Sequence, residues 1–341
     1  MNLPGYNFLP APLWLITILH IVTLTLHLTA MNFLFGGVVV LLFGRLENKW
    51  QDPTVRSYIK LLPAAMAATV TLGVAPLLFL QLVYYEQAYS AAIVSAWLWL
   101  GIIDAAIVAY YFFYGASFSV DGKPARMPVF LGVSFVLLLF ISLIYSTVFS
   151  MAERPDLYRT LYAENQSGFV INTDVGSWVF RWLHMLLGAV TVGGFFVGFV
   201  GRNSEPVFKL GKSFFLYGMI ATMVVGLAYL FTLADYMVPF MRSPAIWVLM
   251  VSIVLSLGTL HFYFKKKWVG AFAMLFLSFL GMVTIRHMLR LIALDGHFDP
   301  GSIPVAPQWS VFGIFLVCFV VAIGLVWYML RLFLIDRRQE T

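Results

Sequence analysis

The stretch WLITILHIVTLTLHLTAMNFLFGGVVVLL, residues 14–42, decides the fold of this chain. It exceeds the ~20 apolar residues that a helix needs to cross a bilayer, yet it contains His20 and His27. Their spacing is close to two helical turns, which puts both imidazoles on one face, about 10 Å apart along the axis. Because ionisable side chains are costly inside a membrane, the pair indicates a functional site. The alternative is that each is a neutral histidine bonded to a neighbouring helix.

The composition excludes a soluble globular protein, since 62% of residues are hydrophobic and only 11% are charged. The one cysteine, Cys318, excludes disulfides, iron–sulfur clusters and covalently attached haem, so any haem is held non-covalently. The first twelve residues lack a basic segment and a cleavage-like site, so we expect the first apolar run to be retained as a helix. The net charge of +6 is divided between membrane sides and does not indicate nucleic acid.

The hydropathy pattern predicts an all-α, polytopic membrane bundle that forms one integral membrane domain over residues 1–341. We find no soluble domain and no internal repeat, and only residues 152–176 form a longer polar connection. About nine transmembrane helices are expected, near residues 12–44, 59–84, 91–114, 127–150, 177–201, 212–233, 243–263, 268–293 and 309–335.

Lysine and arginine gather in alternate connections, as in Lys265–Lys267, and the positive-inside rule makes that side cytoplasmic. The N-terminus is then outside and the C-terminus inside, as in a multi-pass protein of a bacterial-type inner membrane. The opposite connections are acidic, with Glu153, Asp156 and Asp174 among others. Such a face could attract a basic c-type cytochrome or another redox subunit, although an ordinary solvated loop surface is an equal alternative.

Three histidines are expected at one depth in the outer half of the bundle: His20, His184 and His287. His27 is expected two turns deeper. This set predicts ligands for a metal, and the flat apolar surroundings favour haem iron over zinc or copper. Arg181, Arg286 and Arg290 lie about one turn from these histidines and are candidate partners of haem propionates, with interfacial anchoring as the alternative.

Asp104 is the acidic residue placed deep in a predicted span. Intramembrane carboxylates often mark proton relays or contacts to a quinone or haem, so Asp104 is the candidate catalytic residue. A salt bridge to a neighbouring helix is the structural alternative.

Three segments together resemble subunit I of the cytochrome bd-type quinol oxidases, with the resemblance strongest over residues 12–235. ILHIVTLTLHL resembles the first-helix haem-ligand segment, with His20 at the ligand position. LGIIDAAIVAYYFFYG resembles the acidic third-helix segment, with Asp104 in place of a glutamate. FRWLHMLLGAVTVGG resembles the fifth-helix segment, with His184 at the position of the low-spin haem ligand. The resemblance implies b-type haems, two or more, and a quinone as a second candidate ligand.

The chain departs from that family at several functional positions. The long quinol-binding loop between the sixth and seventh helices is replaced by about ten residues around ADYMVPFMRS. The methionine ligand of the seventh helix is not evident, and Arg286 and His287 stand where the eighth helix would carry a glutamate. The second glutamate of the third helix is absent, and His27 is additional.

These observations favour a haem b-binding electron-transfer subunit of a respiratory complex, passing electrons between the quinone pool and haem proteins outside the membrane. Whether the chain is itself an oxidoreductase is left open. The first alternative is a terminal quinol or cytochrome c oxidase that reduces oxygen. The second is a membrane transporter or scaffold without redox chemistry. Apart from lipid and quinone, the expected partners are proteins.

Overall fold

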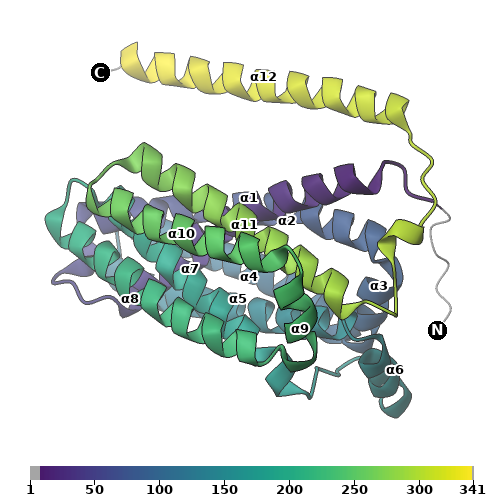
Figure 1. Ribbon diagram of the computed structural model, residues 1–341. Helices are drawn as coiled ribbons and strands as arrows, with labels where there is room; N and C mark the ends of the chain where they lie inside the picture. Colours follow the sequence, from purple (N-terminus) through teal and green to yellow (C-terminus); the bar gives the residue numbers. More distant parts are fainter. Residues whose placement is uncertain (1–7, 340–341) are drawn as a thin grey trace.

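The computed structural model describes residues 8–339, and within them the chain is all-α with nine helices long and apolar enough to cross a membrane (Figure 1). The prediction of a polytopic helical bundle is confirmed, and the chain is a multi-pass membrane protein. We expected no cleaved signal peptide at the N-terminus. Residues 1–7 of that segment lie outside the described residues. The long helices are α1 (Leu13–Phe43), α2 (Pro53–Val83), α4 (Ala96–Ser119), α5 (Met127–Ala152), α7 (Val179–Val200), α8 (Glu205–Phe231), α10 (Ala245–Phe264), α11 (Trp268–Ala293) and α12 (Trp309–Gln339).

Three short helices stand in connections that the hydropathy pattern does not resolve: α3 (Tyr85–Val94), α6 (Pro155–Glu164) and α9 (Ala234–Arg242). The span expected at residues 91–114 therefore begins later, at Ala96, because residues up to Val94 belong to α3. The short connection around ADYMVPFMRS contains α9. The long polar connection contains α6, which begins with a proline at its first position, where a missing N–H costs nothing.

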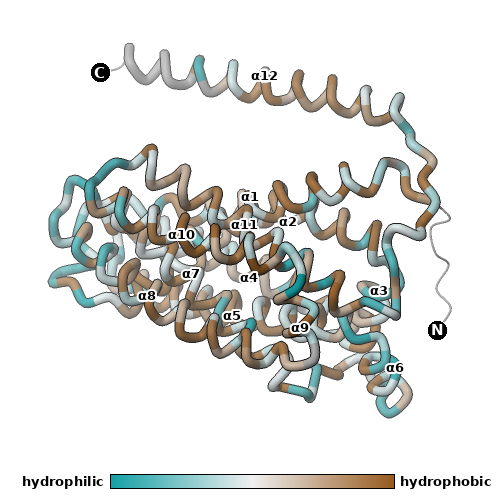
Figure 2. Tube along the Cα trace, in the orientation of Figure 1, coloured by the Kyte–Doolittle hydropathy of each residue, from teal (hydrophilic) through white to brown (hydrophobic). Residues whose placement is uncertain are grey.

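Polar residues gather at the two ends of the bundle and apolar residues fill the length between them (Figure 2). One end, here called the acidic end, carries α3, α6 and α9. The other, the basic end, carries the connections that contain Lys49, Lys123, Arg202 and Lys266. This separation by charge agrees with the arrangement expected from the positive-inside rule.

Helices α1 and α7 run in the same direction and cross with their backbones in contact. A Cβ atom added to Gly36 would lie 1.8 Å from the carbonyl oxygen of Ala189, and one added to Gly193 would lie 2.0 Å from the carbonyl carbon of Gly36. Only glycine permits such an approach, which is common between membrane helices. The crossing joins the α1–α2 and α4–α5 hairpins to the α7–α8 and α10–α11 hairpins.

The buried apolar side chains fall into clusters near the two ends of the bundle. The largest cluster, toward the basic end, includes Phe113, Phe195 and Tyr263, and two others lie toward the acidic end around Ile144 and Phe240. Between them is a level, here called the middle layer, whose apolar side chains belong to none of these clusters. It comprises residues 17–32 of α1, 67–76 of α2, 179–191 of α7 and 220–228 of α8.

Helix α12 lies apart from the other helices (Figure 1), and the apolar stretch Trp309–Met329 has no buried residue. Its attachment to the bundle is through the segment before it. There Leu9 and Val305 form a parallel β-bridge, with the Leu9 N–H donating to the Pro304 carbonyl at 2.7 Å.

Candidate haem-binding site

Three of the four candidate ligand histidines are held by the same kind of hydrogen bond. The Nδ1 atom lies 3.0 Å from the Pro76 carbonyl oxygen in His20, 2.9 Å from that of Thr69 in His27, and 3.0 Å from that of Thr222 in His184. A carbonyl oxygen can only accept, so each Nδ1 carries the proton and donates it. This tautomer leaves the Nε2 lone pair free, and an outer hydrogen bond of this kind orients histidines that bind metals.

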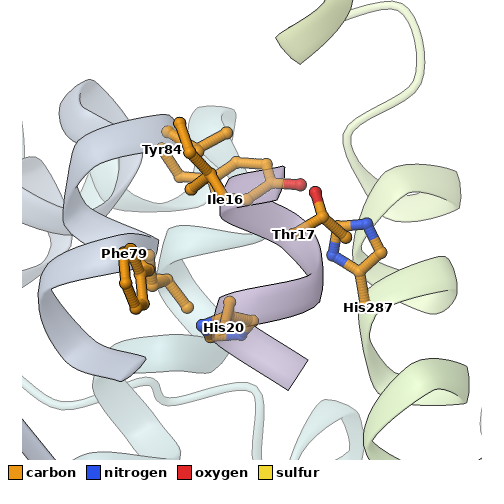
Figure 3. A pocket seen from close by; sticks show the side chains of 8 residues that line it. Ile16, Thr17, His20, Phe79, Tyr84 and His287 are labelled. Carbon is orange, nitrogen blue, oxygen red and sulfur yellow. The ribbon is translucent and has the colours of Figure 1, made fainter. Parts of the chain in front are cut away.

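His20 and His287 line one narrow crevice between α1, α2 and α11 at the acidic end, where Thr17 lies beside His287 and His20 lies nearer to Phe79 (Figure 3). The cavity volume of this crevice is about 10 Å³, room for a single water molecule. The remaining wall is apolar except for Tyr84, and includes Phe79 and Leu80. The Nδ1 atom of His287 is buried without a hydrogen-bond partner in the described part of the chain. The crevice therefore brings together two of the predicted ligands.

We expected His184 at the depth of His20. In the structure it lies instead at the level of His27. Helices α1 and α7 cross at Gly36 and Gly193. His27 is nine residues before Gly36, and His184 is nine residues before Gly193. Each histidine is therefore about 13 Å from the crossing, measured along its own helix axis. The expectation failed because it counted residues from the predicted helix ends. Helix α1 extends farther beyond the crossing than α7 does, so equal distances from the ends are not equal depths.

The three predicted arginines converge on one carboxylate, that of Glu153, just after α5. Arg181 Nη1 lies 3.0 Å from Glu153 Oε2, Arg290 Nε lies 3.4 Å from Oε1, and Arg286 also pairs with Oε1. Glu153 is only 7% exposed. Burial alone would raise the pKa of Glu153, but the three guanidiniums, Arg286 above all, outweigh it and hold this pKa at about 2.

This arginine cluster keeps an excess of two positive charges, because an ionised Glu153 neutralises one guanidinium out of three. The Nη1 atom of Arg290 is buried without an acceptor in the described residues. The same guanidinium lies over the ring of Tyr84, 5.3 Å from its centroid, and Tyr84 lines the crevice. The cluster thus adjoins the crevice and offers unused positive charge to an anionic group.

Asp104 is not brought together with the histidines. Its side chain is exposed on α4, it does not line the crevice, and it has no hydrogen-bond or ion-pair partner among residues 8–339. The proposed salt bridge to a neighbouring helix is absent within this part of the chain. Its role in proton transfer stays a prediction.

No group of three or more His, Cys, Asp or Glu side chains within the described residues could hold a metal ion by protein ligands alone. A haem iron needs fewer protein ligands, because the porphyrin supplies four ligands and the protein only one or two imidazoles. Histidines with free Nε2 atoms and a cluster of guanidiniums are side chains of the kind that hold a haem, whereas the crevice as it stands, at about 10 Å³, would have to widen to admit a porphyrin. A bare zinc or copper ion has no such fit.

Sequence reasoning missed two features of the site. Glu153 was interpreted only as one of several acids on the outer face, although an acidic residue directly after a span is a candidate partner for intramembrane arginines. The carbonyl partners Thr69 and Thr222 were also missed, because they belong to the backbone. Their sequence signal is a glycine four residues later, Gly73 and Gly226, beside which each imidazole lies.

No protein-family model matches this chain, and no curated protein matches it. The resemblance to the cytochrome bd-type oxidases therefore stays a prediction from three segments.

Proposed function

We propose that this chain is a haem b-binding electron-transfer subunit of a respiratory complex in a bacterial-type inner membrane. It passes electrons between the membrane quinone pool and haem proteins at the acidic end. The observation that carries the proposal is the crevice lined by His20 and His287, beside the arginine cluster of Arg181, Arg286 and Arg290.

Charge supports a haem in particular. Haem b carries two propionate groups, and the arginine cluster has two positive charges more than Glu153 neutralises. Guanidiniums are well suited to carboxylates because they bind them bidentately and remain charged when buried. Arg290 also has a buried donor, Nη1, without an acceptor in the described residues. Occupation by carboxylates would relieve the cost of that unpaired donor.

The residues of this chain have distinct tasks in the proposed site. The bound haem would supply one-electron redox chemistry. His20 would supply an imidazole that its bond to the Pro76 carbonyl keeps in one orientation, and His287 lines the same crevice beside Thr17. Apolar Phe79 and Leu80 exclude water from the crevice. Exclusion of water and nearby positive charge are two means by which a protein sets a haem potential.

The acidic end also carries the surface through which electrons would leave or enter. Exposed carboxylates there include Asp156, which is 79% exposed, and Asp174, which is 48% exposed. Carboxylates on one surface attract basic partners such as c-type cytochromes and accelerate their encounter. The chain spans the membrane with nine apolar helices, which supports access to quinone dissolved in lipid. The partner and the quinone belong to the proposal.

A reduced-minus-oxidised visible spectrum of the purified chain tests the proposal directly. We expect a b-type haem spectrum that weakens in His20→Ala and in His287→Ala while the protein still elutes as a single folded species. His261→Ala is the matched control, since His261 is an exposed histidine of α10 at the basic end. A wild-type chain produced with abundant haem and showing no haem absorption would overturn the proposal.

Electron transfer needs a separate measurement. Haem in the purified chain should be reduced by a soluble quinol and then reoxidised by a c-type cytochrome. Haem that is bound but accepts no electrons from quinol would contradict the assigned function while leaving the binding site in place. A spectrum unchanged by His20→Ala and His287→Ala together would contradict the assigned ligands.

A further inference from the structure

The lysines and arginines of the basic end differ between the two halves of the bundle. In the half formed by α1, α2, α4 and α5, several are already bound within the chain. Lys60 Nζ lies 2.8 Å from a carboxylate oxygen of Asp121, and Arg56 pairs with the same carboxylate at 3.4 Å. Lys49 donates to two carbonyl oxygens at the end of α1, at 3.2 and 2.7 Å.

The half formed by α7, α8, α10 and α11 carries basic side chains with one acid among them. Segments 201–212 and 265–267 contain six basic residues and only Glu205 as an acid, whereas segments 44–60 and 120–126 contain six basic residues and three acids. Glu205 pairs with Lys209 at 3.6 Å, and among residues 8–339 no other carboxylate pairs with these basic side chains. This surface, here called the basic patch, comprises Arg202, Lys209, Lys212, Lys265, Lys266 and Lys267.

Aromatic rings hold the two segments of the basic patch side by side. Lys212 Nζ lies 4.6 Å from the ring centroid of Phe264, at the end of α10, and Lys266 Nζ lies 4.6 Å from that of Phe208 in α8. A lysine of each segment therefore lies over a ring of the other. A ring face attracts an ammonium group but carries no net negative charge, so the charge of both lysines remains for an outside anion.

The turn between α10 and α11 presents three consecutive lysines to solvent. It is closed by the Lys266 N–H, which donates to the Tyr263 carbonyl, and by the Lys267 N–H, which donates to the Phe262 carbonyl, both at 2.9 Å. Lys266 has a φ of 52°, in the left-handed region that favours glycine after a helix. A lysine at this position adds charge to the basic patch where glycine would fit the backbone more easily.

Apolar surface that faces lipid begins directly beside the basic patch. Phe264 is 42% exposed and Val269 is 87% exposed, and both belong to helices apolar enough to cross a membrane. Unpaired positive charge thus adjoins exposed hydrocarbon. A phospholipid matches both surfaces, because its phosphate is anionic and its acyl chains are apolar. A soluble anion or an acidic protein would use the charge alone.

We propose that the basic patch binds the headgroup phosphate of an anionic phospholipid, of the class of phosphatidylglycerol and cardiolipin. The inference does not depend on haem, and it concerns the end of the bundle opposite the crevice of His20 and His287. Lysines beside a membrane attract anionic lipids, and salt screens this attraction where the charges are exposed.

Native mass spectrometry of the full chain in detergent, with added lipid, tests the inference. We expect the chain to retain phosphatidylglycerol and cardiolipin and to release phosphatidylcholine. The triple variant Lys265→Gln, Lys266→Gln, Lys267→Gln should retain phosphatidylglycerol at least about tenfold more weakly, because one lysine near anionic lipid contributes about fivefold. The matched control is Arg45→Gln, Arg126→Gln, Lys123→Gln, which removes the same charge from the other half and should have a much smaller effect.

Lys266→Gly separates the charge of the basic patch from its backbone. Glycine suits the left-handed turn, so this variant should unfold at the same temperature as the wild type or higher, yet retain less phosphatidylglycerol. Unchanged retention in Lys266→Gly and in the lysine triple variant would overturn the proposal. Equal losses in the two triple variants would also overturn it, since they would reflect net charge rather than a site.

Two further outcomes would assign the basic patch to another ligand. Excess glycerol phosphate should leave the lipid bound, and displacement would identify a soluble anion instead. Unchanged lipid retention, together with loss of a co-purifying acidic protein from the lysine triple variant, would identify a protein partner. Either result would contradict lipid binding while leaving the proposed electron-transfer function untouched.

Discussion

Replacement of Glu153 by glutamine would leave the guanidiniums of Arg181, Arg286 and Arg290 buried together without a counter-ion. Removal of one partner from a buried ionic group typically costs ~3–5 kcal/mol, because the remaining charge is left uncompensated. We therefore expect Glu153→Gln to lower the thermal unfolding temperature of the detergent-solubilised chain clearly. Asp174→Asn is the matched control. It breaks the exposed pair with Arg154 and should cost at most ~1 kcal/mol.

The same carboxylate predicts how stability depends on pH. The pKa of Glu153 is lowered from 4.5 to about 2 in the folded chain, by the guanidiniums that overcome the effect of burial. A lowered carboxyl pKa contributes stability that is complete above the unfolded value and is lost as pH falls through the folded value. This contribution should be constant from neutral pH down to about 4.5 and decline from there toward pH 2. Wild type and Glu153→Gln, compared by acid titration of unfolding, should converge in that window. A constant difference down to pH 2 would contradict the assignment.

At the scale of the helix, the sequence was sufficient to predict each helix that corresponds to one long apolar run. All nine spans were anticipated because about 20 apolar residues leave the backbone no alternative in lipid. Short helices such as α3 were missed because their mixed composition resembles that of a loop. The depth of His184 was wrong for a related reason. Depth is set by the contact of Gly36 with Gly193, and a contact between distant residues has no local pattern.

The glycine crossing of α1 and α7 gives a prediction at this scale. A leucine at Gly36 would place side-chain atoms where the carbonyl of Ala189 now stands, and the two helices would have to separate. Overpacking of this kind commonly costs ~1–3 kcal/mol and more where backbone must move. Gly36→Leu should therefore reduce both stability and haem content. Gly132→Leu in α5 is the control, because a Cβ there meets nothing within 4 Å. Equal behaviour of the two variants in thermal unfolding would count against the crossing.

At the scale of the whole molecule, the separation of acidic and basic ends predicts how the chain sits in the membrane. Lysines and arginines near spans remain on the cytoplasmic side, so the connection with Lys265–Lys267 should be inside and α6 outside. In a Cys318→Ser background, Lys266→Cys and Glu164→Cys place one thiol at each end. A membrane-impermeant maleimide applied to intact spheroplasts should label Glu164→Cys and spare Lys266→Cys. Labelling with the opposite preference would invert the proposed topology and place the crevice of His20 and His287 on the cytoplasmic side.

The arrangement of acids and histidines also decides between electron transfer and oxygen reduction. Reduction of oxygen requires an iron with an open position and protons delivered through a dry interior. Within the described spans, Asp104 lies deep in the membrane but is exposed on α4, away from the crevice, and Glu153 is committed to three arginines. Neither carboxylate is placed to carry protons to the crevice. His287 lines that crevice together with His20, so in the proposed site it would offer a second imidazole to the haem, and a haem held by two imidazoles would be low-spin and poor at binding gases. Addition of carbon monoxide to the reduced chain should therefore change its spectrum little, and quinol should drive no oxygen uptake. His287→Ala should increase the carbon monoxide response. A large stoichiometric shift in the wild-type chain would instead favour a terminal oxidase.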